Sequence, residues 1–293
     1  MNVRGEPRDD PRRSRWLVLS GSVVFAAMYV CVKLLGPNVS SFEVLFTRSV
    51  IGSAICLVLL RRVGASAGWG SWKLNLVRSA FGFASIASQF LALHEGGCAL
   101  STVSFLRHAA PVWMLLLAGP LLQEWPDRRA KLAVAVGIVG TALALRPQGA
   151  EAGWGIALAA GSGLFAALEL LSLRRLTATE HPLSVVLFFM GFIELVTTPI
   201  CATKWASEGF EWSARDAALV IGSALLGTLG QILVTTAYRY GRAVSTAVAA
   251  LAEVVFTLLF AWTIARDAVP PWPVFVGGGA ILAAAWLSVR ARE

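Results

Sequence analysis

The chain has 293 residues, of which 57% are hydrophobic and only 14% charged, and its mean hydropathy is +0.69. A water-soluble domain cannot hydrate such a surface, so the composition excludes that class and indicates that lipid surrounds most of the chain. The formal net charge is +8, but the basic residues lie mostly in short loops and tails, so we attribute the charge to membrane orientation and not to nucleic-acid binding.

Ten apolar stretches long enough to span a bilayer follow one another along the chain. Crossing ~30 Å of hydrocarbon takes about 20 helical residues. A basic tail, residues 1–15, precedes the first stretch, which is too long for the core of a cleavable signal peptide. The predicted spans are residues 16–36, 42–60, 74–94, 98–118, 130–146, 153–173, 184–202, 215–236, 243–263 and 271–289.

The distribution of basic residues predicts the orientation of these spans. Seventeen lysines and arginines fall in segments on the side of the N-terminus, and four fall in segments on the other side. Cytoplasmic loops of membrane proteins carry the excess of positive charge. We therefore expect a multi-pass protein of the bacterial cytoplasmic (inner) membrane with both termini in the cytoplasm.

One sequence unit occurs twice. GSVVFAA at Gly21–Ala27 returns as GSGLFAA at Gly161–Ala167, 140 positions later. Two further sequence matches between the units occur in the same order: Gln89 matches Gln231, and Ala99–Thr102 matches Ala243–Thr246. Five spans fit in each unit, 16–146 and 153–290, and because five is odd the second unit enters the membrane from the opposite side. Such inverted repeats are typical of secondary transporters.

Several motif positions resemble the EamA branch of the drug/metabolite transporter superfamily. Arg48 follows Thr47 early in the second span, and Pro111 is followed by Glu124 at the end of the fourth. The second unit carries a similar pair at the same spacing, but Val254 and Asp267 stand where the family has proline and glutamate. The resemblance covers about residues 16–290 and implies an all-α integral membrane protein with ten spans in two inverted five-helix repeats. It also implies a transporter of small molecules that needs no cofactor.

Ionisable residues inside the spans are the candidate functional groups. Arg107, Glu169, Glu194 and Glu253 lie well within apolar stretches, where each would cost ~2.5–3.5 kcal/mol if it faced lipid. They must therefore face a partner or a water-filled cavity. Arg107 suits a substrate carboxylate, and Glu194 or Glu253 an ammonium group, while the alternative is an Arg107–Glu pair that joins two helices. His108 is adjacent, but residues about 100° apart on a helix cannot both point squarely into one cavity.

The remaining candidates are weaker. Gln89 and Gln231 form either mirrored contacts in the substrate path or an amide bond between helices. Trp113 either lines the path or packs between helices. We predict a substrate path lined by Gln89, Arg107, His108, Trp113, Glu194, Gln231 and Glu253. Proton coupling or ion pairing is assigned to Glu169, Glu194 and Glu253, with Glu169 able to pair with a loop arginine, and an ion cluster on the outer side to Lys33, Glu43 and Arg48.

Other function classes find little support. The sequence holds no HExxH or Ser/His/Asp arrangement for an enzyme and no phosphate-binding loop, and no metal site is expected. The four cysteines lack metal-ligand or redox spacing: Cys31, Cys56, Cys98 and Cys201. The leading hypothesis is export of amino acids by alternating access. Import of a vitamin or nucleotide-like compound and drug export remain alternatives, and a membrane-embedded enzyme is a remote one.

Small residues mark the fifth and tenth spans. Ala133, Gly137 and Thr141 share one helical face, and Gly279 and Ala283 share another. Such faces allow helices to approach closely. We expect them to serve as scaffold or as the contact of a homodimer.

Overall fold

The structure is a computed structural model that describes residues 10–36, 38–65, 70–94, 96, 98, 100–146, 153–210, 212–266 and 271–289. Within these residues all regular secondary structure is helical, as the composition predicts. Asp267 of the second motif pair and residues 1–9 of the basic tail lie outside the described residues.

The helices overlap all ten predicted spans, and the fourth and ninth spans are each divided in two. Seven segments are long and apolar enough to cross a membrane, among the residues that the structure describes. They include α4 with α5 and α10 with α11 taken as continuous spans. The bounds are α1 Pro11–Lys33, α2 Ser41–Arg62, α3 Trp72–His94, α4 Leu100–His108, α5 Ala110–Leu122, α6 Arg128–Leu145, α7 Trp154–Thr179, α8 Pro182–Glu208, α9 Ala214–Tyr240, α10 Ala243–Ala250, α11 Ala252–Thr263 and α12 Trp272–Val289.

Polar residues between the apolar stretches determine where several helices begin. Ser40 caps α2 by accepting from the Glu43 backbone N–H at 3.3 Å, and the Glu43 carboxylate accepts from the Ser40 N–H at 2.8 Å. The Asp127 carboxylate accepts from the N–H of Ala130 at 2.7 Å and so begins α6. Caps of this kind satisfy N–H groups that have no partner within the helix.

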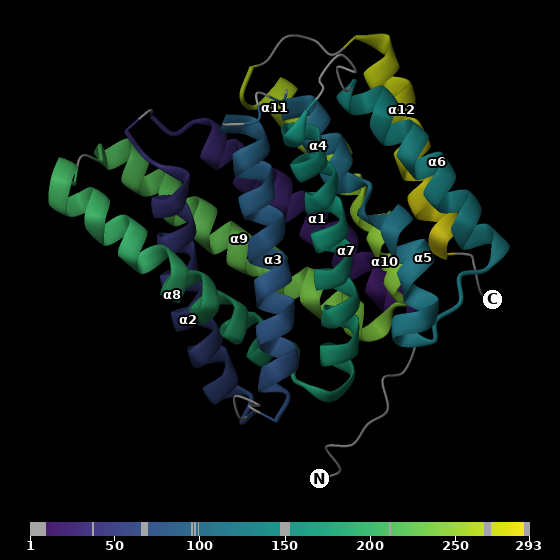
Figure 1. Cartoon of the computed structure of the whole chain (residues 1–293), viewed down its shortest axis with the longest axis horizontal. Coiled ribbons are helices and arrows are strands. Elements are labelled where there is room, and N and C mark those ends of the chain that lie inside the picture. The colour runs from purple at the N-terminus through teal and green to yellow at the C-terminus, as the bar shows by residue number, and fades with distance from the viewer. Residues whose placement is uncertain are drawn as a thin grey trace.

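Helices from the two halves of the sequence pack in pairs. The most extensive contacts join α1 to α9, α3 to α7, α2 to α8, and α6 to α12. Figure 1 shows α6 beside α12 at one edge of the bundle and α2 near α8 at the other. Neither half therefore packs as a separate unit, and the centre of the molecule lies between them.

The small residues of α6 are used inside the molecule. A Cβ atom on Gly140 would lie 2.8 Å from the carbonyl oxygen of Gly277, so the backbones of α6 and α12 are almost in contact. Ala133 and Thr141 are fully buried. By contrast, Gly279 and Ala283 are exposed on α12. The scaffold role of the α6 face is therefore visible, while a homodimer contact through the exposed α12 face stays a prediction.

The fourth and ninth predicted spans each contain a break. Ala109 separates α4 from α5, and Leu251, 142 positions later, separates α10 from α11. Hydrogen bonds of the tighter i to i+3 type surround both breaks: Leu106 O with Ala109 N at 3.3 Å, and Val248 O with Leu251 N at 3.1 Å. Pro111 accounts for the first break because it has no N–H to donate to the helix. No proline stands at the second.

Candidate functional site

A cavity of about 540 Å³ lies at the centre of the bundle, between helices of both halves. Its volume is within the range of ~300–1,000 Å³ typical of small-molecule sites. Among the described residues no three His, Cys, Asp or Glu side chains group closely enough to hold a metal ion. Apolar side chains form most of the wall, and its polar members include Tyr29, Arg48, Gln89, Arg107, His108, Glu169, Gln231, Tyr238 and Glu253.

The cavity extends toward the connection between α1 and α2. Leu35, Gly36 and Val39 of that connection belong to its wall, as does Ser41 in the first turn of α2. At the other end the described wall reaches Tyr238, in the last turn of α9. The cavity therefore approaches the α1–α2 end of the bundle.

Arg107 and His108 both line the cavity, although two neighbouring residues of a helix cannot both point squarely into it. Both residues lie in the last turn of α4, which ends at His108 before the chain turns at Ala109. His108 Nδ1 lies 2.8 Å from the carbonyl oxygen of Ser104, one turn earlier, which holds the imidazole close to its own helix. A straight helix would separate the two side chains by about 100°.

Glu253 is the centre of a cluster of polar groups from four helices. Tyr29 on α1 forms a side-chain hydrogen bond with Glu253 on α11. Arg107 on α4 and Arg48 on α2 are both close enough to interact electrostatically with Glu253 and with Tyr29. The cavity therefore presents a carboxylate and two guanidinium groups to the same space.

Arg48 is held loosely by α9. Its Nη2 atom lies 3.4 Å from the carbonyl oxygen of Gly227 and 3.5 Å from Gln231 Oε1, which are long distances for charged donors. Nε has no hydrogen-bond partner among the described residues. A Cβ atom on Gly227 would lie only 2.8 Å from Nε, so glycine is what lets the guanidinium occupy this place.

Glu43 and Arg48 of the predicted outer ion cluster contact different helices. Glu43 accepts from Lys204 Nζ and from Trp205 Nε1, both at 2.7 Å and both on α8. Arg48 turns instead to α9, because five residues along a helix correspond to a rotation of about 140°. Lys33 is the last residue of α1.

Arg78 is a buried charge that the sequence analysis missed. It is 0% exposed, and its Nη2 atom lies 2.9 Å from Glu169 Oε1, an ion pair between α3 and α7. Its guanidinium carbon also lies 3.9 Å from the centroid of the Phe189 ring. Arg78 is only four residues inside the predicted span 74–94, where it looked like an interfacial residue. Glu169 therefore pairs with an arginine inside the bundle, and the predicted pairing with a loop arginine is wrong.

Three other predicted residues have definite places. Glu194 is half-buried on α8, outside the cavity wall, and its neighbour Leu195 is 74% exposed. Its carboxylate has no ion pair or hydrogen bond among the described residues, so the expectation that it faces a partner or the cavity is not met. Trp113 packs against the apolar core and also lies outside the wall. Gln89 lines the cavity and donates to the Ser85 carbonyl of its own helix at 3.0 Å. Of the two glutamates proposed for an ammonium group, only Glu253 is placed to contact a substrate in this cavity.

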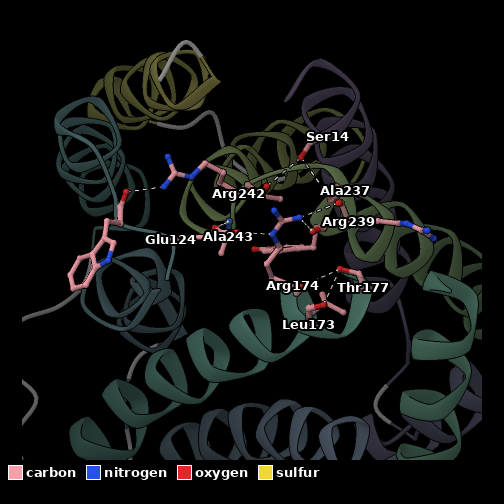
Figure 2. Close-up of polar contacts among 12 residues, drawn as sticks. Ser14, Glu124, Leu173, Arg174, Thr177, Ala237, Arg239, Arg242 and Ala243 are labelled. Atoms are coloured by element: carbon pink, nitrogen blue, oxygen red, sulfur yellow. Dashed lines mark hydrogen bonds and ion pairs between the residues drawn. The ribbon is translucent and has the colours of Figure 1, made fainter. Parts of the chain in front are cut away.

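A polar network joins helix ends at the side opposite the α1–α2 connection (Figure 2). Arg174 Nε donates to Glu124 Oε1 at 2.8 Å, and its Nη1 donates to the carbonyl oxygens of Tyr238 and Arg239 at 3.0 Å. The second oxygen of Glu124 accepts from the backbone N–H of Ala243 at 2.8 Å. Glu124 and Arg174 thus connect the ends of α5, α7, α9 and α10.

Further bonds strengthen this network. Arg242 Nη2 donates to the carbonyl oxygen of Trp125 at 2.8 Å, and Ser14 Oγ donates to that of Ala237 at 3.0 Å. Tyr238 belongs both to the cavity wall and to the network, where its carbonyl oxygen accepts a hydrogen bond from Arg174. The network therefore lies directly beyond one end of the cavity.

Comparison with known proteins identifies the family whose sequences this chain matches. The sequence profile of the EamA-like transporter family matches residues 13–146 and 153–290. The pseudopaline exporter CntI of Pseudomonas aeruginosa (strain UCBPP-PA14) is 24% identical over 275 residues, which are 93% of this chain and 94% of that protein. An uncharacterised transporter of Helicobacter pylori (strain 26695) is 27% identical over 253 residues, 83% and 84% of the two chains. A solved crystal structure with 17% identity has the same fold, with a TM-score of 0.74 over 94% of this chain and 95% of that chain.

Replacing Glu169 by glutamine is expected to lower the free energy of unfolding by about 3–5 kcal/mol, because Arg78 would remain buried without a negative partner. Denaturant unfolding of the purified protein in detergent measures the change. Glu208→Gln, at the exposed end of α8, is the control, and it should change stability by less than ~0.5 kcal/mol. Equal losses in the two variants would contradict a specific role for the ion pair.

Proposed function

The chain belongs to the EamA-like transporter family, and from this premise we propose that it exports amino acids across the bacterial cytoplasmic membrane as a secondary transporter that works by alternating access. The family and the curated relatives are transporters and not enzymes. Opposite charges that face one central cavity, Arg107 and Glu253, are the observation that carries the proposal.

The proposed architecture is ten spans in two inverted repeats, with both termini in the cytoplasm. In such a repeat α1 is equivalent to α7, and α3 is equivalent to α9. The contact of α1 with α9 is therefore equivalent to the contact of α7 with α3. In the same way α2 is equivalent to α8 and α6 to α12, so the α2–α8 and α6–α12 contacts each join two equivalent helices. The matching breaks at Ala109 and Leu251 support the same equivalence. The excess of basic residues on the side of the termini supports the orientation.

The chemistry of the cavity suits a zwitterion. A guanidinium such as that of Arg107 binds a carboxylate through charge-assisted hydrogen bonds. Glu253, with the Tyr29 hydroxyl beside it, suits the substrate ammonium. The pseudopaline exporter among the relatives supports transport in the outward direction.

The two ends of the bundle differ in a way that supports alternating access. The cavity reaches the α1–α2 connection, which is periplasmic in the proposed orientation, while the Glu124–Arg174 network joins four helix ends on the cytoplasmic side. We interpret this arrangement as an outward-facing state closed toward the cytoplasm. Opening to the cytoplasm requires that the network break.

Transport by proteoliposomes tests the proposal. Purified protein is expected to move labelled amino acids, and Arg107→Ala should reduce this movement about 10- to 100-fold, because one hydrogen bond to a charged group contributes about 1.5–3 kcal/mol. Arg215→Ala, in an exposed position at the start of α9, is the control and should behave like the wild type. Movement only of cationic drugs or of a vitamin would replace amino acids as the substrate, and no movement of any compound would contradict the proposal.

Proton coupling is assigned to Glu253. An imposed pH gradient is expected to drive amino-acid movement by the wild type, and Glu253→Gln should abolish this dependence because an amide cannot take up or release the proton. Glu194→Gln should leave the dependence intact, since Glu194 is outside the cavity wall. Uptake with and without the gradient measures both. If the two variants keep the dependence, neither carboxylate carries the proton.

Breaking the network should expose the cavity to the cytoplasm. A thiol reporter, Leu170→Cys in the cavity wall, is placed in a chain whose four native cysteines are replaced by serine. Glu124→Gln is expected to raise the labelling of this reporter cysteine about tenfold, because the ion pair between Glu124 and Arg174 is lost. The labelling is measured with an impermeant thiol reagent in inside-out vesicles. Asp127→Asn, which keeps the cap of α6, is the control. Unchanged labelling in Glu124→Gln would show that the network is not the cytoplasmic closure.

A further inference from the structure

The charges that face the cavity do not balance. Its described wall carries four charged side chains: Arg48, Arg107, Glu169 and Glu253. Glu169 is already paired with the buried Arg78, 2.9 Å away. With histidine counted as neutral, two guanidinium groups and one carboxylate remain, which leaves one uncompensated positive charge.

A cavity whose wall carries an excess of one sign of charge attracts ligand groups of the opposite sign, because its low-dielectric walls focus the electric field. Arg48 has unused hydrogen-bonding capacity. A guanidinium has five N–H donors. Within the described residues its contacts to oxygen are 3.4 and 3.5 Å long, its contact to Met28 Sδ is 3.6 Å, and Nε has no partner.

We propose that the cavity selects amino acids that carry a second carboxylate. Arg107 binds the α-carboxylate, Glu253 with Tyr29 binds the ammonium, and Arg48 binds the second carboxylate. Such a substrate has one negative charge in excess and so balances the wall. This inference rests on the proposed function and specifies the substrate class of the same site.

The position and size of the site agree with this assignment. Arg48, Arg107 and Glu253 come from three different helices and line the same cavity, and Glu253 interacts electrostatically with both arginines, so a ligand in the cavity faces all three groups. The planar guanidinium matches both oxygens of a carboxylate, which a lysine would not do. A volume of about 540 Å³ leaves room for a second carboxylate beyond the amino acid itself.

L-glutamate and L-glutamine are the probes, because they differ in one carboxylate and hardly in shape. Wild-type proteoliposomes are expected to prefer glutamate over glutamine by about tenfold or more. Arg48→Gln should reduce glutamate movement to the rate of glutamine and leave glutamine almost unchanged. Arg215→Gln is the control and should keep the preference.

A second variant tests the position of Arg48 without removing its charge. The new Cβ in Gly227→Ala would lie 2.8 Å from Arg48 Nε, so the flexible side chain must move away while the helix stays intact. We expect this variant to lose part of the preference for glutamate. Gly222→Ala on the same helix, whose Cβ would lie 3.9 Å from Cys31 Sγ, should keep it.

The outcomes separate this inference from the exporter proposal. If the wild type moves glutamine as fast as glutamate, or if Arg48→Gln slows both equally, the second-carboxylate site is wrong while amino-acid export stands. If Gly227→Ala and Gly222→Ala both keep the full preference, Arg48 does not bind the second carboxylate. If the wild type moves no amino acid at all, the exporter proposal and this inference are both wrong.

Discussion

The cost of a charge inside the bilayer is the constraint on which the centre of this protein depends. Charged side chains within a span must find a partner or water, because hydrocarbon offers neither. Arg78 and Glu169 meet this requirement by pairing with each other between α3 and α7. Arg48, Arg107 and Glu253 meet it by facing a cavity. The same requirement therefore separates a structural ion pair from the groups that remain available to a substrate.

The proposed repeat provides the cavity, but the two halves contribute different chemistry to it. Tyr29 in the first half and Glu169 in the second stand at the same place, eight residues after the first glycine of the repeated phrase. Both line the cavity, yet Tyr29 bonds to Glu253 whereas Glu169 pairs with Arg78. The two halves of the proposed repeat thus surround a site whose charged groups are not arranged symmetrically. A zwitterion, whose two ends differ, is suited to such a site.

The helix ends at the Glu124–Arg174 network are stabilised by charges that match them. Arg174 donates to the carbonyl oxygens of Tyr238 and Arg239 at the C-terminus of α9, where the helix dipole is negative. Glu124 accepts from the N–H of Ala243 at the N-terminus of α10, where it is positive. Breaking the network frees both ends together, which is what the proposed cytoplasmic closure requires.

The sequence by itself determined the helical spans and the presence of charges within them, because span length and hydropathy are local properties set by the thickness of the bilayer. It also singled out Arg107, Glu253, Gln89 and Gln231 as candidates, and all four line the cavity. Only the tertiary structure decided which helical face each residue turns inward. That choice excluded Glu194 from the wall, gave Glu43 the partner Lys204, and buried Arg78 against Glu169. It depends on packing between helices far apart in the sequence, and no local pattern contains that information.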